Sequence, residues 1–162
     1  SNKEIITTEG LKQQSIKEKA DKDNANKLLK KEIESQNKLK IQSIKDDIIK
    51  NINNTNDANT FVGEVDLDPK SIKELCFILS DKFENLFLIL LSKSDEKVFI
   101  SCFISKELIE EKELNASKII KELSPLINGS GGGQSFYATG GGTNINGIDS
   151  VIKESKKIIS QI

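Results

Sequence analysis

The residues of this sequence best suited to chemistry lie in a glycine-rich stretch, residues 128–142, which reads NGSGGGQSFYATGGG. Seven of the ten glycines of the chain lie there, in two blocks that bracket residues 134–139. Glycine loses more backbone entropy on ordering than any other residue. We therefore expect either a backbone that must turn sharply or one that another molecule must approach closely.

Three interpretations of this stretch compete. A nucleotide-binding P-loop is rejected, because that motif needs Lys-Ser/Thr after its last glycine, whereas Gln134 follows Gly133. A dinucleotide fingerprint fails as well, because Gln134 stands where its third glycine should be. A flexible linker stays open on composition. The alternation of Phe136 and Ala138 instead predicts a short strand over residues 135–139. Such a strand would suit a backbone platform for nucleic acid, with an aromatic residue beside it.

Three residue types are missing from the chain. Without histidine it lacks the usual general base and the commonest metal ligand. Without arginine, all 24 basic residues are lysines, so phosphates would be bound by point charges rather than bidentate forks. The chain also lacks methionine, and we expect it to be a piece of a longer protein. Cys76 and Cys102 lie in apolar patterns, which predicts reduced core cysteines in a cytoplasmic protein.

The net charge of −1 is unevenly distributed along the chain. Residues 1–56 carry 12 lysines and 9 acidic residues, and residues 57–122 carry 9 lysines and 14 acidic residues. Residues 123–162 have a net charge of +1. A nucleic-acid partner is expected to avoid the acidic middle and to bind near the glycine-rich stretch. No apolar run reaches the ~18 residues of a membrane span, so no membrane partner is expected.

Residues 3–52 are polar, with apolar residues at helical spacing from Leu29 to Ile52. They predict a long helical, coiled-coil-like segment that packs on another helix. The segment is either one rod, with residues 21–26 as the candidate break, or a hairpin. Asparagine-rich residues 51–59 form the candidate connector. The predicted domains are therefore a helical subdomain, residues 1–56, and a globular subdomain, residues 57–162.

The globular subdomain alternates strand and helix signals. Strands are predicted at residues 61–65, 86–91 and 98–104, the last two as a central antiparallel hairpin. Helices are predicted at residues 69–82, 106–112, 116–124 and 146–162. Asp68, Asn115, and either Asn144 or Asn146 are the predicted N-caps, and Pro125 ends the third helix. The predicted class is α/β (α+β), a small mixed sheet packed with helices after a long helical segment.

Residues 104–142, above all the motif GSGGGQSFYATGGG, resemble the C-terminal domain of bacterial alanyl-tRNA synthetases. That domain belongs to the DHH-associated class, which also occurs in nucleic-acid-processing phosphoesterases. The resemblance extends over about residues 60–162. The family often has proline where Ser135 stands, glycine where Glu113 and Ser117 stand, and a basic residue near Gln134.

The resemblance implies a tRNA-binding appendage that grips the elbow of tRNA-Ala and has no catalysis of its own. The parent enzyme is implied to be an ATP-dependent ligase that uses ATP, magnesium and a zinc ion, none of them held in this part. The alternative is a structural module that dimerises through the N-terminal helix or packs on the rest of the synthetase. The predicted tRNA-binding residues are Gly131, Gly132, Gly133, Gln134, Phe136, Tyr137, Gly140, Gly141, Gly142, Lys153, Lys156 and Lys157. If Phe136 faces the core beside Ala138, Tyr137 is the exposed ring.

Overall fold

The computed structural model describes the backbone of residues 2–162 and the side chains of residues 24–162. It divides into two units, Ser1–Leu39 and Lys40–Ile162. Helix α1 (Asn2–Asn51) is one continuous helix, so neither a break at residues 21–26 nor a hairpin is observed. In the first unit, α1 exposes four large apolar side chains: Leu28, Leu29, Ile33 and Leu39.

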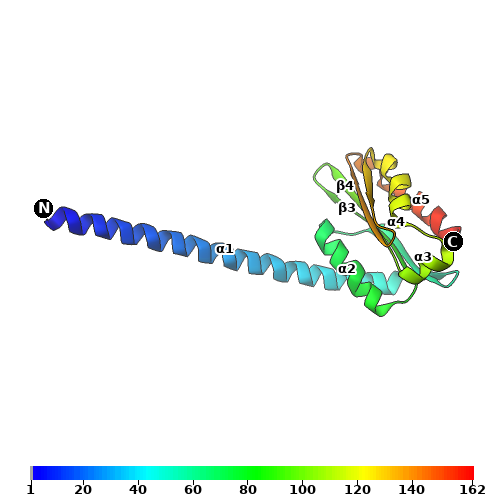
Figure 1. The fold of residues 1–162 in the computed structure, drawn as a ribbon, viewed down its shortest axis with the longest axis horizontal. Helices are drawn as coiled ribbons and strands as arrows, with labels where there is room; N and C mark the ends of the chain where they lie inside the picture. Colours follow the sequence, from blue (N-terminus) through cyan, green and yellow to red (C-terminus); the bar gives the residue numbers. More distant parts are fainter. Residues whose placement is uncertain (1) are drawn as a thin grey trace. The chain divides into compact units, whose positions relative to one another are not determined.

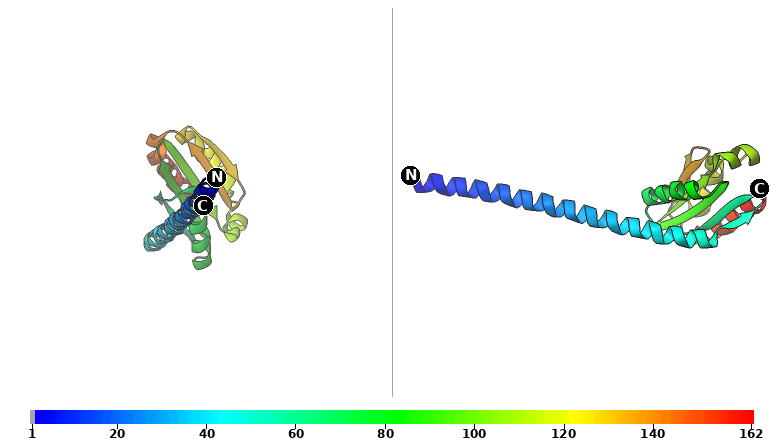
Figure 2. Two further views of the ribbon diagram at one scale, coloured as in Figure 1. Left: turned by 90° about the vertical axis from the view of Figure 1, so that its left-hand side faces the viewer. Right: turned by 90° about the horizontal axis from the view of Figure 1, so that it is seen from below.

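The second unit contains a six-stranded mixed sheet, and Figures 1 and 2 show helices on both of its faces. The spatial order is β1-β2-β3-β4-β6-β5. The strands are β1 (Asn53–Thr55), β2 (Ala58–Glu64), β3 (Leu86–Ser94), β4 (Lys97–Ile104), β5 (Ser130–Gly133) and β6 (Tyr137–Gly142). Only the β2–β3 pair is parallel among these strands, and α2 (Pro69–Lys82) connects it. The predicted fold class is confirmed, with β3 and β4 as the central antiparallel pair.

Strand β3 divides the core into two layers because its side chains alternate between the faces. Phe87, Ile89 and Leu91 pack with residues of α4 (Ala116–Leu123) and α5 (Ile148–Ser160). Leu86, Leu88 and Leu90 pack with α2 and with Ile41 and Ile48 from the end of α1. Full burial of each such side chain stabilises the fold by roughly 1.5–3 kcal/mol. The continuous apolar run in β3 thus follows from burial on both faces.

Local signals predicted several helix ends correctly. Helix α2 begins at Pro69, and the preceding Asp68 accepts a hydrogen bond from Ser71 Oγ rather than from the backbone. Helix α3 (Lys106–Lys112) has the predicted bounds, and it ends at Glu113 with a left-handed φ of 54°. The family's glycine at that position suits this conformation, because glycine adopts positive φ without a steric penalty. Asn115 caps α4 by accepting from Lys118 N at 3.2 Å.

The structure corrects two predictions, one about the connector at residues 51–59 and one about the start of the last helix. The connector at residues 51–59 contains β1 and the start of β2, joined by Asn56 and Asp57 with φ of 52° and 66°. Asn and Asp tolerate left-handed backbone, so this pair makes a tight hairpin turn that looked like a polar linker. Helix α5 begins at Ile148, after a 3₁₀ turn, η2 (Ile145–Gly147), so neither Asn144 nor Asn146 caps it. The Asn144 side chain instead donates to Leu126 O at 3.3 Å.

Candidate nucleic-acid interface

The two glycine blocks form the strands of one hairpin. Gly131 lies opposite Gly140, and Gly132 opposite Thr139. The hairpin is tied down around its turn, because Gln134 N donates to Tyr137 O at 2.9 Å and Ala116 N to Ser135 O at 2.9 Å. The linker interpretation is therefore wrong. The predicted strand at residues 135–139 is misplaced, because Ser135 and Phe136 lie in the turn and the glycines themselves form the strands.

Strand β5 is the last strand at one edge of the sheet. Residues of an antiparallel pair alternate between exchanging hydrogen bonds and pointing their backbone groups away from each other. Since Gln134 bonds Tyr137, this alternation directs the backbone groups of Gly131 and Gly133 away from β6. The hairpin thus presents outward-facing backbone amides along an edge that carries no side chains at three successive residues.

The glycines of this hairpin differ in what surrounds them. A β-carbon at Gly131 would overlap Gly140 Cα and Thr139 O, and one at Gly142 would overlap Ile127 O. By contrast, a β-carbon at Gly132 would lie 3.7 Å from Lys121 Cε and 3.7 Å from Ser117 Oγ, which are ordinary contacts. At Gly141 the nearest atom would be Phe99 Cδ1, at 3.6 Å. Some of the glycines therefore permit close packing within the protein, whereas others leave the surface open.

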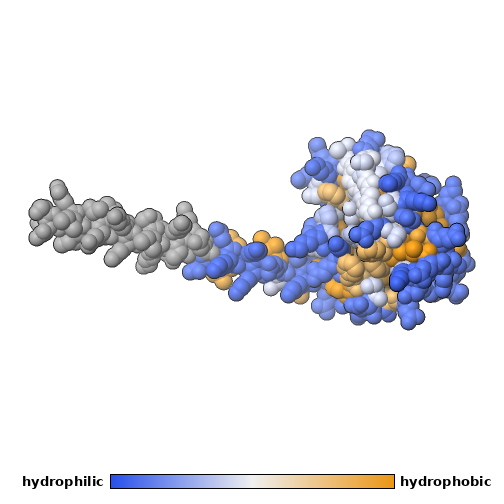
Figure 3. Space-filling view, in the orientation of Figure 1, coloured by the Kyte–Doolittle hydropathy of each residue, from blue (hydrophilic) through white to orange (hydrophobic). Residues whose placement is uncertain are grey.

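The predicted tRNA-binding residues of the hairpin also differ in burial. Gly140 is buried, whereas Gly133 and Gln134 are exposed and the other hairpin glycines are intermediate. Figure 3 shows a pale surface, of intermediate hydropathy, over the strands on the face that it displays. The predicted platform is consequently narrower than the two blocks together, because Gly140 is buried. The accessible backbone of β5 comprises Gly131, Gly132 and Gly133, and of these only Gly132 has room for a β-carbon.

The two neighbouring aromatic residues differ in their exposure. Phe136 lies in the turn and is 39% exposed. Tyr137 is the first residue of β6; it is half-buried and packs with the core cluster that includes the apolar residues of α2. The condition under which Tyr137 would be the exposed ring, that Phe136 faces the core, is not met, and Phe136 is the more exposed of the two rings. Burial raises the pKa of the Tyr137 phenol. The Lys73 ammonium lies 5.7 Å from the centre of the Tyr137 ring, within cation–π range.

The predicted lysines of the last helix do not join the hairpin. Lys153, Lys156 and Lys157 are exposed on α5. Lys156 lines a hollow with residues of β1 and β2, at the sheet edge opposite β5. A phosphate contact at these lysines would thus belong to a different part of the surface from the glycine hairpin.

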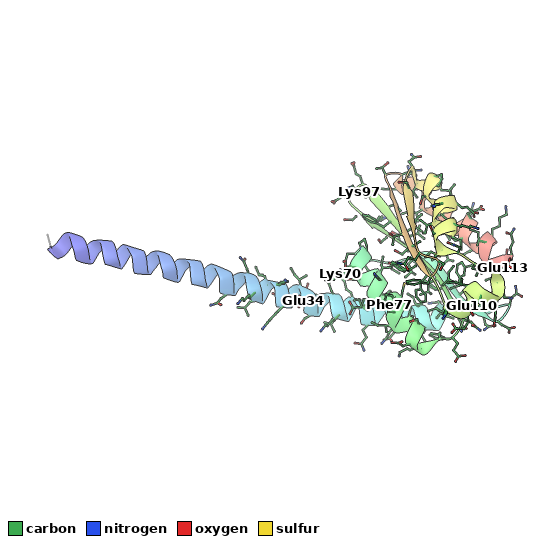
Figure 4. All side chains as sticks on the ribbon, viewed as in Figure 1. Glu34, Lys70, Phe77, Lys97, Glu110 and Glu113 are labelled. Carbon is green, nitrogen blue, oxygen red and sulfur yellow. The ribbon has the colours of Figure 1, made fainter. Side chains whose placement is uncertain are left out.

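Sequence reasoning missed two lysines that lie near the hairpin, Lys73 and Lys121. Lys70, Lys73 and Phe77 are exposed at spacings of three and four residues, so they share one face of α2. Figure 4 labels Lys70 and Phe77 on this helix. Lys121 of α4 adjoins Gly132. All of these lysines come from the acidic middle of the sequence. They were missed because a net charge summed along the chain does not show where single charges lie in space. The helical spacing of Lys70, Lys73 and Phe77 was the available signal.

Among the residues whose side chains are described, no three His, Cys, Asp or Glu residues form a group that could hold a metal ion. No helix within the described residues has the length and apolar character required to cross a membrane.

Comparison with known proteins defines the class of this domain. The family model of the DHHA1 domain matches residues 57–161, and the chain belongs to this family. The likeness to the C-terminal domain of bacterial alanyl-tRNA synthetases is confirmed by relatives named alanine–tRNA ligase. The protein from Christiangramia forsetii is 38% identical over 131 residues, covering 81% of this chain and 15% of that protein. The protein from Cytophaga hutchinsonii is 45% identical over 89 residues, covering 55% of this chain and 10% of that protein.

A solved structure supports the fold. The C-Ala domain of alanyl-tRNA synthetase from Aquifex aeolicus matches with a TM-score of 0.60 and 24% identity, covering 67% of this chain and 97% of that chain. The chain spans only about one seventh of the length of the curated relatives, as the 15% coverage shows. The domain is thus similar to one terminal part of a much longer enzyme.

Proposed function

We propose that this domain binds tRNA as the C-terminal part of an alanine–tRNA ligase in the cytoplasm. It would grip the elbow of tRNA-Ala and help the longer protein to aminoacylate and edit, without catalysing a reaction itself. The names of the relatives support the enzyme, and the fold shared with the C-Ala domain supports the C-terminal assignment. ATP, magnesium and zinc would act in the rest of that protein.

The observation that carries the proposal is the open edge of the glycine hairpin. Outward-facing amides at Gly131 and Gly133 are donors for phosphate or ribose oxygens, and the absence of side chains lets a nucleic-acid backbone approach closely. Lys121 lies beside this edge, and Lys73 lies by Tyr137. These groups provide the combination of backbone donors, cations and aromatic rings that single-stranded or looped RNA requires.

The test is a titration of the chain with tRNA-Ala and with a truncated acceptor minihelix. Gly132→Val is expected to weaken tRNA binding by at least tenfold while the domain stays folded, because it adds a branched side chain to the bare strand and its β-carbon meets only the Lys121 and Ser117 side chains. Asn54→Val, on the edge strand at the other side of the sheet, is the matched control and should bind normally. Unchanged affinity of Gly132→Val would exclude the hairpin, and equal affinity for the minihelix would exclude the elbow. Contacts made by lysine alone should give a steep salt dependence.

A second function, pairing with another helix, is favoured by one observation. Leu28, Leu29, Ile33 and Leu39 are between 56% and 69% exposed on α1, and such side chains gain from packing on an apolar partner. In this alternative the helix would join two copies or dock on the rest of the synthetase. Sedimentation of the chain with and without tRNA separates the two functions, since a dimer without RNA affinity favours the second.

A further inference from the structure

An apolar pocket lies next to the glycine hairpin and has no part in the edge just described. Its volume is about 520 Å³, within the range of small-ligand sites. Phe77 from α2, Phe103 from β4, Ile109 from α3 and Phe136 from the hairpin turn line it, with Lys106 and Glu110 of α3 as its charged groups. Figure 3 shows an apolar surface over α2 and α3, and Figure 4 labels Phe77 and Glu110, which come from these two helices.

Two phenyl rings of this pocket are left unusually open. Phe77 is 43% exposed and Phe136 is 39% exposed, and no other phenylalanine is among the exposed large apolar residues of the described side chains. The ring of Phe77 is held edge-on to Phe103, with centroids 6.0 Å apart and planes at 74°. Phe103 itself is buried, so it fixes Phe77 without covering it. An open, anchored phenyl ring is a surface on which a planar group can stack.

The surroundings of the pocket connect it to the nucleic-acid interface. Phe136 belongs to the turn of the glycine hairpin itself. On α2, the exposed side chains of Lys70 and Lys73 precede Phe77 on the same face, and Lys73 lies over the Tyr137 ring. Two cations therefore lead along α2 to the pocket. Alternation of cations with open aromatic rings is the pattern by which proteins bind an RNA strand and stack its bases.

We propose that this pocket receives one unpaired base of the RNA whose backbone lies on the glycine hairpin. The base stacks on Phe77 or Phe136, and Lys70 and Lys73 bind the adjoining phosphates. The proposal rests on the proposed function, because it assumes that the hairpin binds RNA. A buried apolar peptide segment would also fit the apolar walls, but it would not need cations along α2.

The charged residues of the pocket add a chemical preference. The Glu110 carboxylate only accepts hydrogen bonds, so it favours a base that carries an amino group, as in carboxylate recognition of the cytosine amino group. Lys106 can donate to a carbonyl oxygen or ring nitrogen of the same base. Uracil lacks an amino group and offers such a carboxylate only its ring N3–H. The pocket should therefore prefer cytosine, adenine or guanine to uracil.

The test compares phenylalanine variants of the chain in titrations with tRNA-Ala. Phe77→Leu keeps an apolar side chain but removes the stacking ring. We expect a loss of affinity of about 5- to 150-fold, which corresponds to the free energy of stacking one base on an aromatic ring. Phe77→Tyr keeps the ring and should bind like the wild type. Phe61→Leu makes the same chemical change in a half-buried residue of β2, which β3 and β4 separate from the hairpin, and it is the matched control. Thermal melts establish that each variant is folded.

The outcomes separate this proposal from the proposed function. Wild-type affinity of Phe77→Leu, with Gly132→Val still defective, overturns the base pocket alone and indicates an apolar peptide as its occupant. A defect in Phe77→Leu with normal binding by Gly132→Val supports the pocket and excludes the hairpin edge. Absence of tRNA binding by the wild type overturns both. Equal binding of hexanucleotides of cytidine and uridine overturns the amino-group preference.

Discussion

The division of the glycines into packed and open positions makes a sharp prediction about stability. Alanine at Gly131 would place a β-carbon on Gly140 Cα and Thr139 O, which are backbone atoms that cannot rotate away. Forcing an extra carbon into a packed site costs about 1–3 kcal/mol. Alanine at Gly132 meets only the Lys121 and Ser117 side chains, at 3.7 Å each. There it should stabilise by about 0.4–1 kcal/mol, because it restricts the unfolded chain.

The two neighbouring substitutions should therefore differ by about 1.5–4 kcal/mol in the free energy of unfolding. For a unit the size of Lys40–Ile162, 1 kcal/mol moves the Tm by about 3–6 °C. Gly131→Ala is expected to melt well below the wild type, and Gly132→Ala at or slightly above it. Urea titration followed by tyrosine fluorescence suits the measurement, because Tyr137 is the only tyrosine, the chain has no tryptophan, and this residue lies in the hairpin.

Equal midpoints for the two alanine variants would refute the reasoning, since they would show that the hairpin strands can separate enough to admit a β-carbon. The same result would remove the basis for treating Gly132 as a surface position. An unchanged midpoint for Gly132→Ala alone would not refute the reasoning, because the prediction concerns the difference in stability between the two variants. The expected order also gives the RNA experiments a folded variant with an altered edge.

Three further predictions concern the surroundings of the hairpin. Asn115→Ala should lower the free energy of unfolding by about 1 kcal/mol in a denaturant titration, because Lys118 N loses its capping acceptor, and Asn115→Asp should restore most of it. Tyr137 should ionise above its ordinary pKa of 10 in an ultraviolet titration of the folded chain, because burial raises the pKa of its phenol. The neutral phenol therefore contributes to stability below pH 10, and this contribution is lost as the pH rises further. Burial raises the pKa of Cys76 to about 12 and raises that of Cys102 as well, so a thiol reagent at pH 8 should label both only at the rate of unfolding.

Features determined by neighbouring residues were predictable from the sequence. The Asp68-Pro69 start of α2, the Asn115 cap and the apolar run of β3 each depend on a short segment, and the structure has all three. The motif in residues 128–142 also predicted the family. Strand β1 was missed because three polar residues carry no strand signal; their pairing follows from the turn at Asn56 and Asp57.

The arrangement of the candidate site depended on contacts between distant residues. Whether Phe136 or Tyr137 is exposed depends on where β6 begins, and that is set by pairing with β4, in which Phe103 lies opposite Tyr137. A period-2 pattern cannot locate its own first residue, so the sequence alone left open which of the two rings is exposed. The α2 lysines were missed for a related reason, because their distance from the hairpin follows from the packing of α2 over β4.

The two roles of the glycine-rich stretch depend on each other. Gly131 must lack a side chain so that β5 can lie close against Gly140, and this close pairing holds β5 as a straight edge with its amides directed outward. Gly132 needs no such freedom for packing, so its lack of a side chain is unexplained by the fold alone. The fold therefore accounts for one set of glycines, and the proposed binding of RNA at the edge would account for the other. Substitutions at Gly131 should consequently impair stability first, and substitutions at Gly132 should impair binding without loss of stability.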